Sequence, residues 1–420
     1  LGSPIGLAQA QSIPITDQPL FTTAGVPPLM MMVMSRDEQL FIKAYDDYSD
    51  LDGDGILDTT YQDRFDYSGY FDPALCYTYA SGQFSANAVA TGPVAAGQKY
   101  PHQCSGSNFS GNFMNWVAMS RLDVLSFVLD GGRRVAPEPA NGAVLERAPL
   151  PPDLHAWVKV YAGSDTNKYT PYSGTVSFCN ATMSSGAAPT IRAAQGAFPE
   201  WAATALQMCN WRDDAYPAGS GGCSGAAGDN SCYDDAPKSA ALATSTGLTA
   251  RVQVCANASF RESFCEKYTD SSSGAVAYKP VGLLQTYGEK GLMRFGLLTG
   301  SFSKPRSGGV LRRNIGLFAG NTGARDAEGC AADDEINLNN GKFCTHSASG
   351  NKGIVSTIGA LDISGYYGFS AHDWNDCNTY GILNRQGFDG DRYLNDPGVG
   401  GNKQNCAAWG NPLSEMYAEA

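Results

Sequence analysis

The stretch Pro27-Pro-Leu-Met-Met-Met-Val-Met-Ser-Arg-Asp37 decides the fold class of this chain. Its centre, Leu29–Met34, is an unbroken apolar run that two prolines precede and polar residues follow. Runs that stay apolar on both faces are typical of a central parallel strand, although a buried helix segment gives the same pattern. We therefore expect an α/β fold in which residues 29–34 form a strand buried on both faces.

The segment Asp50-Leu-Asp-Gly-Asp-Gly-Ile-Leu-Asp58 has the spacing of an EF-hand-type calcium loop. Carboxylates stand at positions 1, 3, 5 and 9 of the loop, and Gly55 stands at position 6, where the chain turns sharply. Four carboxylates this close repel one another unless a cation lies between them. The predicted ligands of a Ca²⁺ ion are Asp50, Asp52, Asp54, Asp58 and the carbonyl of Ile56.

Position 12 of this loop is Tyr61 instead of the usual bidentate Glu, so Asp63 or Asp66 would have to complete the coordination. No pair of flanking helices is evident, and we expect a loop that stabilises the fold, not a sensor that opens. An ordinary acidic turn is the alternative, because Asp and Gly are also common in turns.

Composition limits the class of partner. The 420 residues carry a net charge of -12 and no basic run, which argues against nucleic acid or an anionic membrane as the main partner. No apolar stretch approaches the roughly 18 residues that a membrane-spanning helix needs. Residues 1–26 are expected to form an extended leader, in which Leu7-Ala-Gln-Ala10 resembles the end of a cleaved signal peptide.

Twelve cysteines indicate a disulfide-bonded, secreted protein. None forms a CxxC pair and the chain has only four histidines, which counts against zinc. Reduced core thiols are the alternative, but Cys223 and Cys232 lie among Gly, Ser and Asp, where no core is available. The expected pairs join sequence neighbours: Cys76 with Cys104, Cys179 with Cys209, Cys223 with Cys232, Cys255 with Cys265, Cys330 with Cys344, and Cys377 with Cys406.

Hydrophobic periodicity predicts several further elements. The expected helices are Asp37–Tyr48, Asn112–Asp130 with Gly131-Gly132 as its stop, Val281–Lys290, a helix through Ile354, Ile358 and Leu361, and a last helix with Asn411 as N-cap. The expected strands are Ala156–Tyr161, Thr175–Cys179, Ala250–Cys255, Met293–Phe302 and Val310–Phe318. Aromatic residues between 61 and 79 are expected to form a small core, with an exposed binding patch as the alternative.

Short motifs along nearly the whole chain resemble those of one family. They are Ser49–Asp58, Gly69-Tyr-Phe-Asp72, Cys76-Tyr-Thr-Tyr79, Gly111-Asn-Phe-Met-Asn-Trp116, Phe198-Pro-Glu-Trp-Ala202, Val252-Gln-Val-Cys255, Tyr278-Lys-Pro280, Gly282-Leu-Leu-Gln285 and Gly308-Gly-Val-Leu-Arg312. In this order they resemble the N-terminal region of PilC/PilY proteins, the adhesins associated with type IV pilus tips. Residues 121–125, 295–298 and 410–416 resemble the first half of a von Willebrand factor A domain.

The resemblance implies a partial von Willebrand factor A-like (Rossmann-like) core. Residues 27–420 would form an incomplete A-like domain with insertions at 36–110, which holds the calcium loop, and at 132–279, which is Cys-rich and contains β-strands. We expect residues 29–34 and 293–302 to be neighbours in an incomplete sheet that leaves one edge or face uncovered. The A-domain metal motif Asp-x-Ser-x-Ser is not preserved after Met34.

The resemblance also implies a function. A PilC/PilY protein is exported through the periplasm to the pilus tip or cell surface, serves pilus biogenesis, adhesion and twitching motility, and would contact minor pilins and a surface or host ligand. The alternative is a calcium-stabilised secreted hydrolase, but neither a Gly-x-Ser-x-Gly nor a His-Glu-x-x-His motif is present. We interpret His155 and His372 as structural or surface residues and the pairs Asp213-Asp214 and Asp333-Asp334 as solvated loop charges, and expect no enzyme. A purely structural pilus subunit would need an N-terminal hydrophobic helix, which the sequence lacks.

Overall fold

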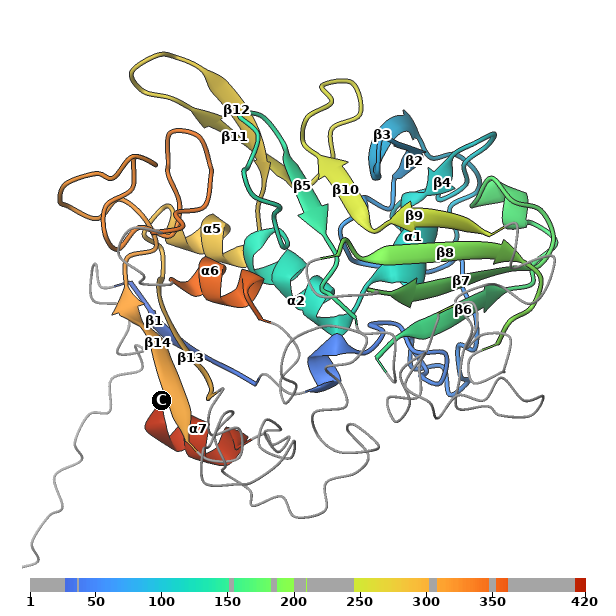
Figure 1. Ribbon diagram of the computed structural model, residues 1–420, viewed down its shortest axis with the longest axis horizontal. Helices are drawn as coiled ribbons and strands as arrows, with labels where there is room; N and C mark the ends of the chain where they lie inside the picture. The colour runs from blue at the N-terminus through green and yellow to red at the C-terminus, as the bar shows by residue number, and fades with distance from the viewer. Residues whose placement is uncertain are drawn as a thin grey trace, which may run out of the picture.

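The computed structural model describes residues 27–35, 38–150, 155–182, 187–199, 209, 245–301, 308–346, 353–361 and 412–420. Within these ranges a small α/β unit lies at one end and a larger β-rich part at the other, with helix α2 (Arg121–Asp130) between them (Figure 1). None of the helices in these ranges is long and apolar enough to span a membrane. The predicted leader, residues 1–26, lies outside the described residues.

The α/β unit is built on a three-stranded sheet in the order β1 (Leu29–Met34), β13 (Arg294–Gly300), β14 (Gly309–Gly316). β1 runs parallel to β13 and β14 runs antiparallel to it. The two strands predicted to be neighbours are therefore paired, although most of the chain separates them in sequence.

β1 is not buried on both faces, so that prediction is wrong for the part of the chain that the structure describes. Leu29 and Met30 are 61% and 42% exposed, and only Met34 at the end of the strand is buried. The reason is the position of β1 in the sheet, because it pairs with β13 on one side and with no described strand on the other. An edge without a described partner strand agrees with the expectation of an incomplete sheet.

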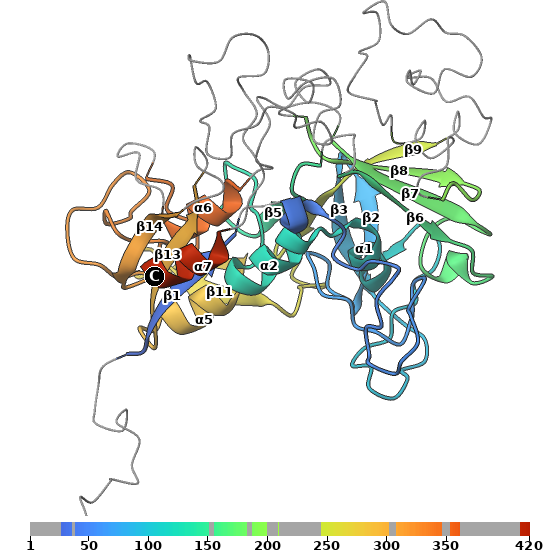
Figure 2. The ribbon, with the colours of Figure 1, turned by 90° about the horizontal axis from the view of Figure 1, so that it is seen from below.

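Four helices surround this sheet. α2 contacts α5 (Leu283–Gly288) and α6 (Ile354–Gly359), and α7 (Leu413–Glu419) crosses all three strands (Figure 2). The buried side chains between helices and strands include Met34, Leu122, Leu284, Phe295, Leu297, Ile354 and Ile358. These contacts confirm the predicted helices near residues 281–290 and 354–361.

α7 is tied to the sheet by its acidic side chains. Glu415 and Glu419 accept hydrogen bonds from the backbone N–H groups of Gly308 and Gly309, at 2.6 and 2.9 Å. The helix begins at Leu413 with Pro412 in the N-cap position, and the predicted cap Asn411 lies outside the described residues.

The single helix predicted over residues 112–130 is instead two helices, α1 (Gly111–Ala118) and α2. Ser120 caps α2 in a capping box: its hydroxyl accepts from the Asp123 N–H at 3.2 Å, and the Asp123 carboxylate accepts from the Ser120 N–H at 2.8 Å. The predicted stop is confirmed, because Gly131 ends α2 in the left-handed conformation at φ 84°.

The predicted helix over residues 37–48 is also wrong. Of the described residues 38–48, only a single 3₁₀ turn is helical, η1 (Glu38–Phe41). The following backbone pairs with the junction between α1 and α2 instead of with itself: the Ala44 N–H donates to the Met119 carbonyl at 2.9 Å, and the Arg121 N–H donates to the Ile42 carbonyl at 3.0 Å. Residues 42–48 therefore connect η1 to the acidic loop as a non-helical segment.

The β-rich part contains three more sheets. A five-stranded sheet has the order β4 (Phe109–Ser110), β2 (Leu75–Ala80), β3 (Gln83–Val89), β10 (Arg251–Val254), β5 (Ala143–Glu146). A four-stranded sheet has the order β6 (Trp157–Tyr161), β7 (Val176–Ala181), β8 (Thr190–Gln195), β9 (Thr246–Thr249), and a 3₁₀ turn, η2 (Thr166–Lys168), follows β6. β11 (Cys265–Thr269) and β12 (Val276–Pro280) form a ribbon. The three strands predicted near 156–161, 175–179 and 250–255 are confirmed.

The aromatic residues after the acidic loop form a core and not an exposed patch, as predicted. The buried members of this core include Tyr61, Tyr67, Tyr70, Phe71, Tyr77, Phe113 and Phe178. Both of the predicted insertions contribute, because residues 75–110 and 143–254 supply strands to the same five-stranded sheet.

Two asparagines of α1 hold the segment that carries these aromatics. Asn112 accepts from the Tyr67 N–H at 2.7 Å, and Asn115 accepts from the Phe71 N–H at 3.1 Å. The Asn115 side-chain amide also donates to the carbonyls of Tyr67 and Phe71, at 2.7 and 2.8 Å. A side chain at Gly69 would lie 2.4 Å from the Asn115 Oδ1, so a glycine is needed there. The motifs at residues 69–72 and 111–116 therefore interlock.

Four of the six predicted cysteine pairs are disulfides in the structure. They join Cys76 to Cys104, Cys179 to Cys209, Cys255 to Cys265, and Cys330 to Cys344. The predicted pairs Cys223 with Cys232 and Cys377 with Cys406 lie outside the described residues.

Candidate metal centre

Two hydrogen bonds close the acidic loop at residues 50–58, one between backbone groups and one from the backbone to a side chain. The Asp58 N–H donates to the Ser49 carbonyl at 2.9 Å, and the Leu51 N–H donates to the Asp58 carboxylate at 2.9 Å. Gly55 turns the chain with φ 87°, a conformation that favours glycine, as the loop motif predicts. The loop therefore has a fixed base and an exposed tip.

Three of the four predicted carboxylate ligands converge. Oxygens of Asp50, Asp52 and Asp58 lie within 4.8 Å of one another, with Asp58 buried and the other two exposed. Asp50 accepts from the N–H groups of Gly53 and Gly55, and the latter bond is the main reason that the pKa of Asp50 lies below its ordinary value. The backbone of the loop thus favours the charged form of Asp50.

The other two predicted ligands lie at the tip of the same loop. Asp54 accepts a hydrogen bond from the Ile56 N–H at 2.8 Å, and Ile56 itself is 69% exposed. Asp54 does not lie within the group formed by the other three carboxylates. Its part in binding a metal, and that of the Ile56 carbonyl, stay predictions.

A cationic side chain that sequence reasoning missed lies against these carboxylates. The Arg64 guanidinium is 3.0 Å from Asp52, 3.6 Å from Asp54 and 3.0 Å from Asp58. The hydrogen bond to Asp58, followed by the charges of Asp52 and its neighbours, raises the pKa of Arg64. The only sequence signal for this contact was a lone basic residue shortly after an acidic run.

Asp63 and Asp66 do not complete the loop, contrary to our expectation. Both face the fully buried ring of His102: its Nε2 lies 2.9 Å from an Asp66 oxygen, and its Nδ1 lies 3.3 Å from an Asp63 oxygen. The turn through residues 61–66 directs these carboxylates into a separate polar cluster, in which Asn112 also takes part. The candidate ligands that remain are therefore those predicted within residues 50–58.

The residues present fit a calcium ion. Calcium binds oxygen ligands at about 2.3–2.6 Å, so two oxygens on opposite sides of one ion lie roughly 5 Å apart. The 4.8 Å span of Asp50, Asp52 and Asp58 is compatible with that geometry. An ion at their centre would take the place of the Arg64 guanidinium, since both need the same oxygens.

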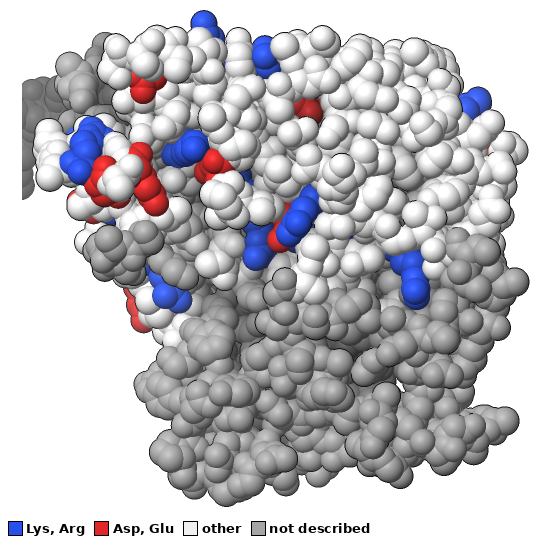
Figure 3. All heavy atoms as spheres, turned by 45° about the horizontal axis from the view of Figure 1, so that its top comes forward, with Lys and Arg blue, Asp and Glu red and all other residues white. Residues whose placement is uncertain are grey.

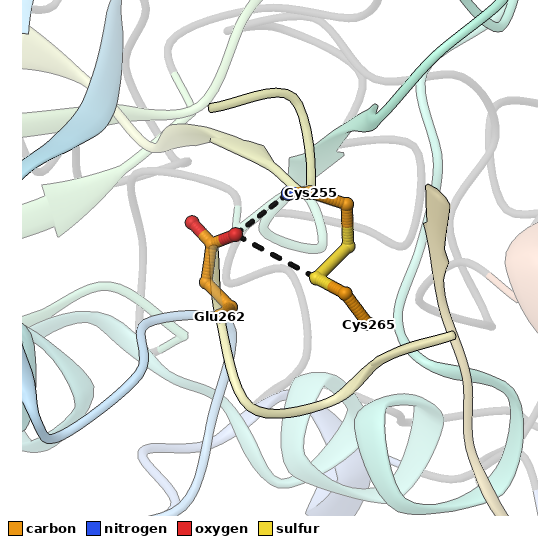
Figure 4. Close-up of side chains that lie close together, drawn as sticks. All are labelled: Cys255, Glu262 and Cys265. Carbon is orange, nitrogen blue, oxygen red and sulfur yellow. Dashed lines mark hydrogen bonds between the residues drawn. A yellow bond between two sulfur atoms is a disulfide. The ribbon is translucent and has the colours of Figure 1, made fainter. Parts of the chain in front are cut away.

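A second cluster of potential ligands does not fit a metal. Figure 4 shows Glu262 beside Cys255 and Cys265, which form a disulfide. The Cys255 N–H donates to the Glu262 carboxylate at 2.6 Å, and the Cys265 sulfur lies 3.6 Å from the same oxygen. Disulfide sulfurs are not thiolates and bind metals poorly. Burial raises the pKa of Glu262 to about 7. The hydrogen bond from the Cys255 N–H lets this carboxyl group hold the turn between β10 and β11.

Both residues of the acidic pair, Asp333 and Asp334, form ion pairs with arginines. Asp333 contacts Arg313 at 2.6 Å, and Asp334 contacts Arg325 at 2.5 Å. Asp334 is 1% exposed, so it is a buried structural residue and not the solvated charge that the sequence indicated. His155 is buried, and Asp213, Asp214 and His372 lie outside the described residues.

Protein-family models match two parts of the chain. Residues 58–197 match the small alpha/beta domain of PilY1 homologs, and residues 295–420 match the second domain of PilY1 homologs. Together the matches cover more than half of the chain. No solved structure matches it.

Curated relatives agree with these models. A type IV pilus biogenesis factor PilY1 homolog of Xylella fastidiosa (strain Temecula1 / ATCC 700964) is 34% identical over 414 residues, which are 93% of this chain and 24% of that protein. A second PilY1 homolog of that strain is 30% identical over 139 residues, 32% of this chain and 10% of that protein. The chain thus spans about a quarter of the first relative. Since two domain models match in order and the identity runs along nearly the whole chain, this protein belongs to the family of PilY1 homologues.

Proposed function

We propose that this chain is a non-catalytic region of a type IV pilus biogenesis factor, positioned at the pilus tip or cell surface. The observation that carries the proposal is the 34% identity to such a factor along 93% of the chain. As a tip-associated adhesin and assembly factor, the protein would contact minor pilins on one side and a surface or host ligand on the other.

Disulfides and charge support this placement. Four disulfides are typical of a protein that folds in an oxidising compartment such as the periplasm. In the part of the face in Figure 3 that the structure describes, most atoms belong to uncharged residues, and the Lys, Arg, Asp and Glu side chains are mixed in sign. With a net charge of -12, a protein partner is favoured over nucleic acid.

We further propose that the β1-β13-β14 sheet and helices α2, α5, α6 and α7 are the first part of a von Willebrand factor A-like domain. Read across the sheet from the β14 edge, the strands are the third, the second and the first in the sequence, which is one half of the strand order 3-2-1-4-5-6 of doubly wound sheets. An antiparallel edge strand such as β14 is common on sheets of this kind.

The third part of the proposal is that Ca²⁺ binds the loop through Asp50, Asp52, Asp54, Asp58 and the Ile56 carbonyl. The loop precedes Arg64, which contacts Asp58, and Tyr67, whose N–H donates to Asn112. The chain then continues into the aromatic core. Calcium would fix this segment by replacing the repulsion between carboxylates with a shared cation. Its role is structural and involves no turnover of substrate.

Two experiments test the proposal in a piliated strain that lacks its native copy. Crosslinking of the complemented full-length protein, followed by mass spectrometry, should join this region to minor pilins. The absence of such crosslinks, while crosslinks within the chain are recovered, would contradict the partner assignment.

The second experiment compares Asp54→Asn/Asp58→Asn with Glu266→Gln, which removes an exposed charge from β11 outside the loop. The loop variant should reduce surface pili and attached cells, and the control should not. Normal piliation with a metal-free loop would remove calcium from the mechanism. Loss of a catalytic activity through one substitution would instead favour a hydrolase.

A further inference from the structure

A cavity of about 850 Å³ lies where α2, the segment after it, the loop around Cys344 and α6 meet. This volume falls within the range of about 300–1,000 Å³ that is usual for small-ligand sites. Segments far apart in sequence build its walls, among them residues 130–138 and 340–345. The cavity is separate from the acidic loop and has no part in the function proposed above.

One wall of the cavity is apolar. Pro137, Phe343 and Val355 line it, together with the small residues Gly359 and Ala360 at the C-terminal end of α6. The Phe343 ring is held in place, because the Arg134 guanidinium stacks on it with its carbon 3.6 Å from the ring centre. This wall favours a hydrocarbon or aromatic group on the ligand.

The acidic side chains of the cavity already have partners within the protein. Glu138 pairs with Arg134 at 3.0 Å and with Lys279 at 3.3 Å, and Glu328 accepts hydrogen bonds from the backbone and side chain of Thr345. The Asp130 carboxylate, at the end of α2, is 2% exposed and accepts from the Gly132 N–H at 3.0 Å. Burial, more than any other cause, raises its pKa to about 7.

Two cations of the cavity, in contrast, lack a counter-ion among the described residues. Neither Arg133 nor Lys342 has a carboxylate within the 4.0 Å of an ion pair, and the Arg133 Nη1 is buried with no hydrogen-bond partner. A buried donor without an acceptor is costly, and the cost is larger for a charged group. The cavity wall thus holds as many basic as acidic side chains, but two of its cations, Arg133 and Lys342, keep N–H donors that no described carboxylate pairs with.

From these two unpaired cations we infer that the cavity binds a carboxylate that bears an apolar group. Arg133 would donate to the carboxylate, for which a planar guanidinium is the best-matched side chain, with Lys342 as a second cation. The apolar group would lie against Pro137, Phe343 and Val355. This chemistry is shared by the C-terminal residue of a peptide and by a small organic acid.

The test measures binding of defined probes to the 420-residue chain by isothermal titration calorimetry. N-acetyl-L-leucine carries the carboxylate and an apolar side chain, and N-acetyl-L-leucinamide is the same molecule without the negative charge. We expect the acid to bind at least about tenfold more tightly than the amide, because the contact with Arg133 is charge-assisted. Equal affinities, or no binding of the acid, would overturn the inference.

Variants locate the site. Arg133→Gln should weaken binding of the acid by about tenfold or more and leave binding of the amide unchanged. Arg121→Gln is the matched control, since it removes an exposed arginine at the other end of α2. Should Arg133→Gln prevent folding, as judged by its circular dichroism melt, Lys342→Gln provides the same comparison. Unchanged acid binding in a folded cavity variant would refute the assignment.

A hexapeptide that ends in leucine, with a free or an amidated C-terminus, identifies the source of the carboxylate. Tighter binding of the free peptide acid than of N-acetyl-L-leucine would assign the cavity to peptide C-termini. Equal binding of the two acids would assign it to small organic acids. Both results support carboxylate recognition.

Discussion

Asn115→Ala should destabilise the protein severely. The Asn115 side chain is fully buried and makes three hydrogen bonds, at 2.7, 2.8 and 3.1 Å, to backbone groups of Tyr67 and Phe71. Truncation leaves these backbone groups without partners in a core where Tyr67 and Phe71 are 2% and 1% exposed. Each such group costs about 1–3 kcal/mol, and with partial relaxation we expect a loss of roughly 3–6 kcal/mol. That is a large fraction of the about 5–15 kcal/mol that stabilises a typical domain.

The assay is equilibrium unfolding in urea at fixed calcium concentration, followed by far-ultraviolet circular dichroism and by tryptophan fluorescence, for which the neighbouring Trp116 is a buried reporter. The matched control is Asn87→Ala, which removes one exposed hydrogen bond to Asn108 and should cost less than about 0.5 kcal/mol. If the midpoints for the two variants were equal within error, the argument that Asn115 organises residues 67–71 would be refuted.

Three further predictions concern calcium, Arg64 and pH. If the loop binds calcium with a Kd near 10 µM, removal of about 1 mM calcium should lower the free energy of unfolding by roughly 2.7 kcal/mol; a melting temperature that chelator leaves unmoved in protein known to be metal-loaded would contradict this. Arg64→Gln should tighten calcium binding, measured by calorimetry, because Arg64 contacts three of the predicted ligands; weaker or equal binding would show that Arg64 does not compete. Burial raises the pKa of Asp130 to about 7, against about 3.9 in an unfolded chain, so the stability linked to its protonation is present below about pH 4 and is lost as pH rises through 7. Asp130→Asn should therefore raise the melting temperature at pH 8 and leave it unchanged at pH 4; the same shift at both values would count against this titration.

Features set by neighbouring residues were predictable from the sequence. Strands such as β6, β7 and β13 carry their own alternating or apolar patterns, and the Gly131 stop is a local conformational preference. Four disulfides join cysteines that are at most 30 residues apart, so pairing by proximity succeeded. The turn geometry of the acidic loop likewise follows from its own glycines.

Features set by distant parts of the chain were not predictable in this way. The break before α2 depends on the Ser120 cap, which lies inside an apolar periodicity that suits one long helix equally well. The segment after η1 pairs with that break, a contact that no helical pattern signals. The contact of Arg64 with the loop and the burial of Asp334 depend on side chains that only the folded chain brings together.

The arrangement of β1 and α7 has a mechanical consequence. β1 pairs along its length with β13, from Leu29 opposite Arg294 to Met34 opposite Thr299, and α7 is anchored at Gly308 and Gly309, beside the far end of β13. A tensile force that pulls Leu29 and α7 apart therefore acts along the strands, so the hydrogen bonds between β1 and β13 are loaded in shear and must break together instead of one after another. The force passes from β1 through β13 and β14 to α7, and the β-rich part, from β2 to β12, does not carry it. Tension would cross the molecule through three strands and one helix, and would leave the acidic loop and the aromatic core unstretched.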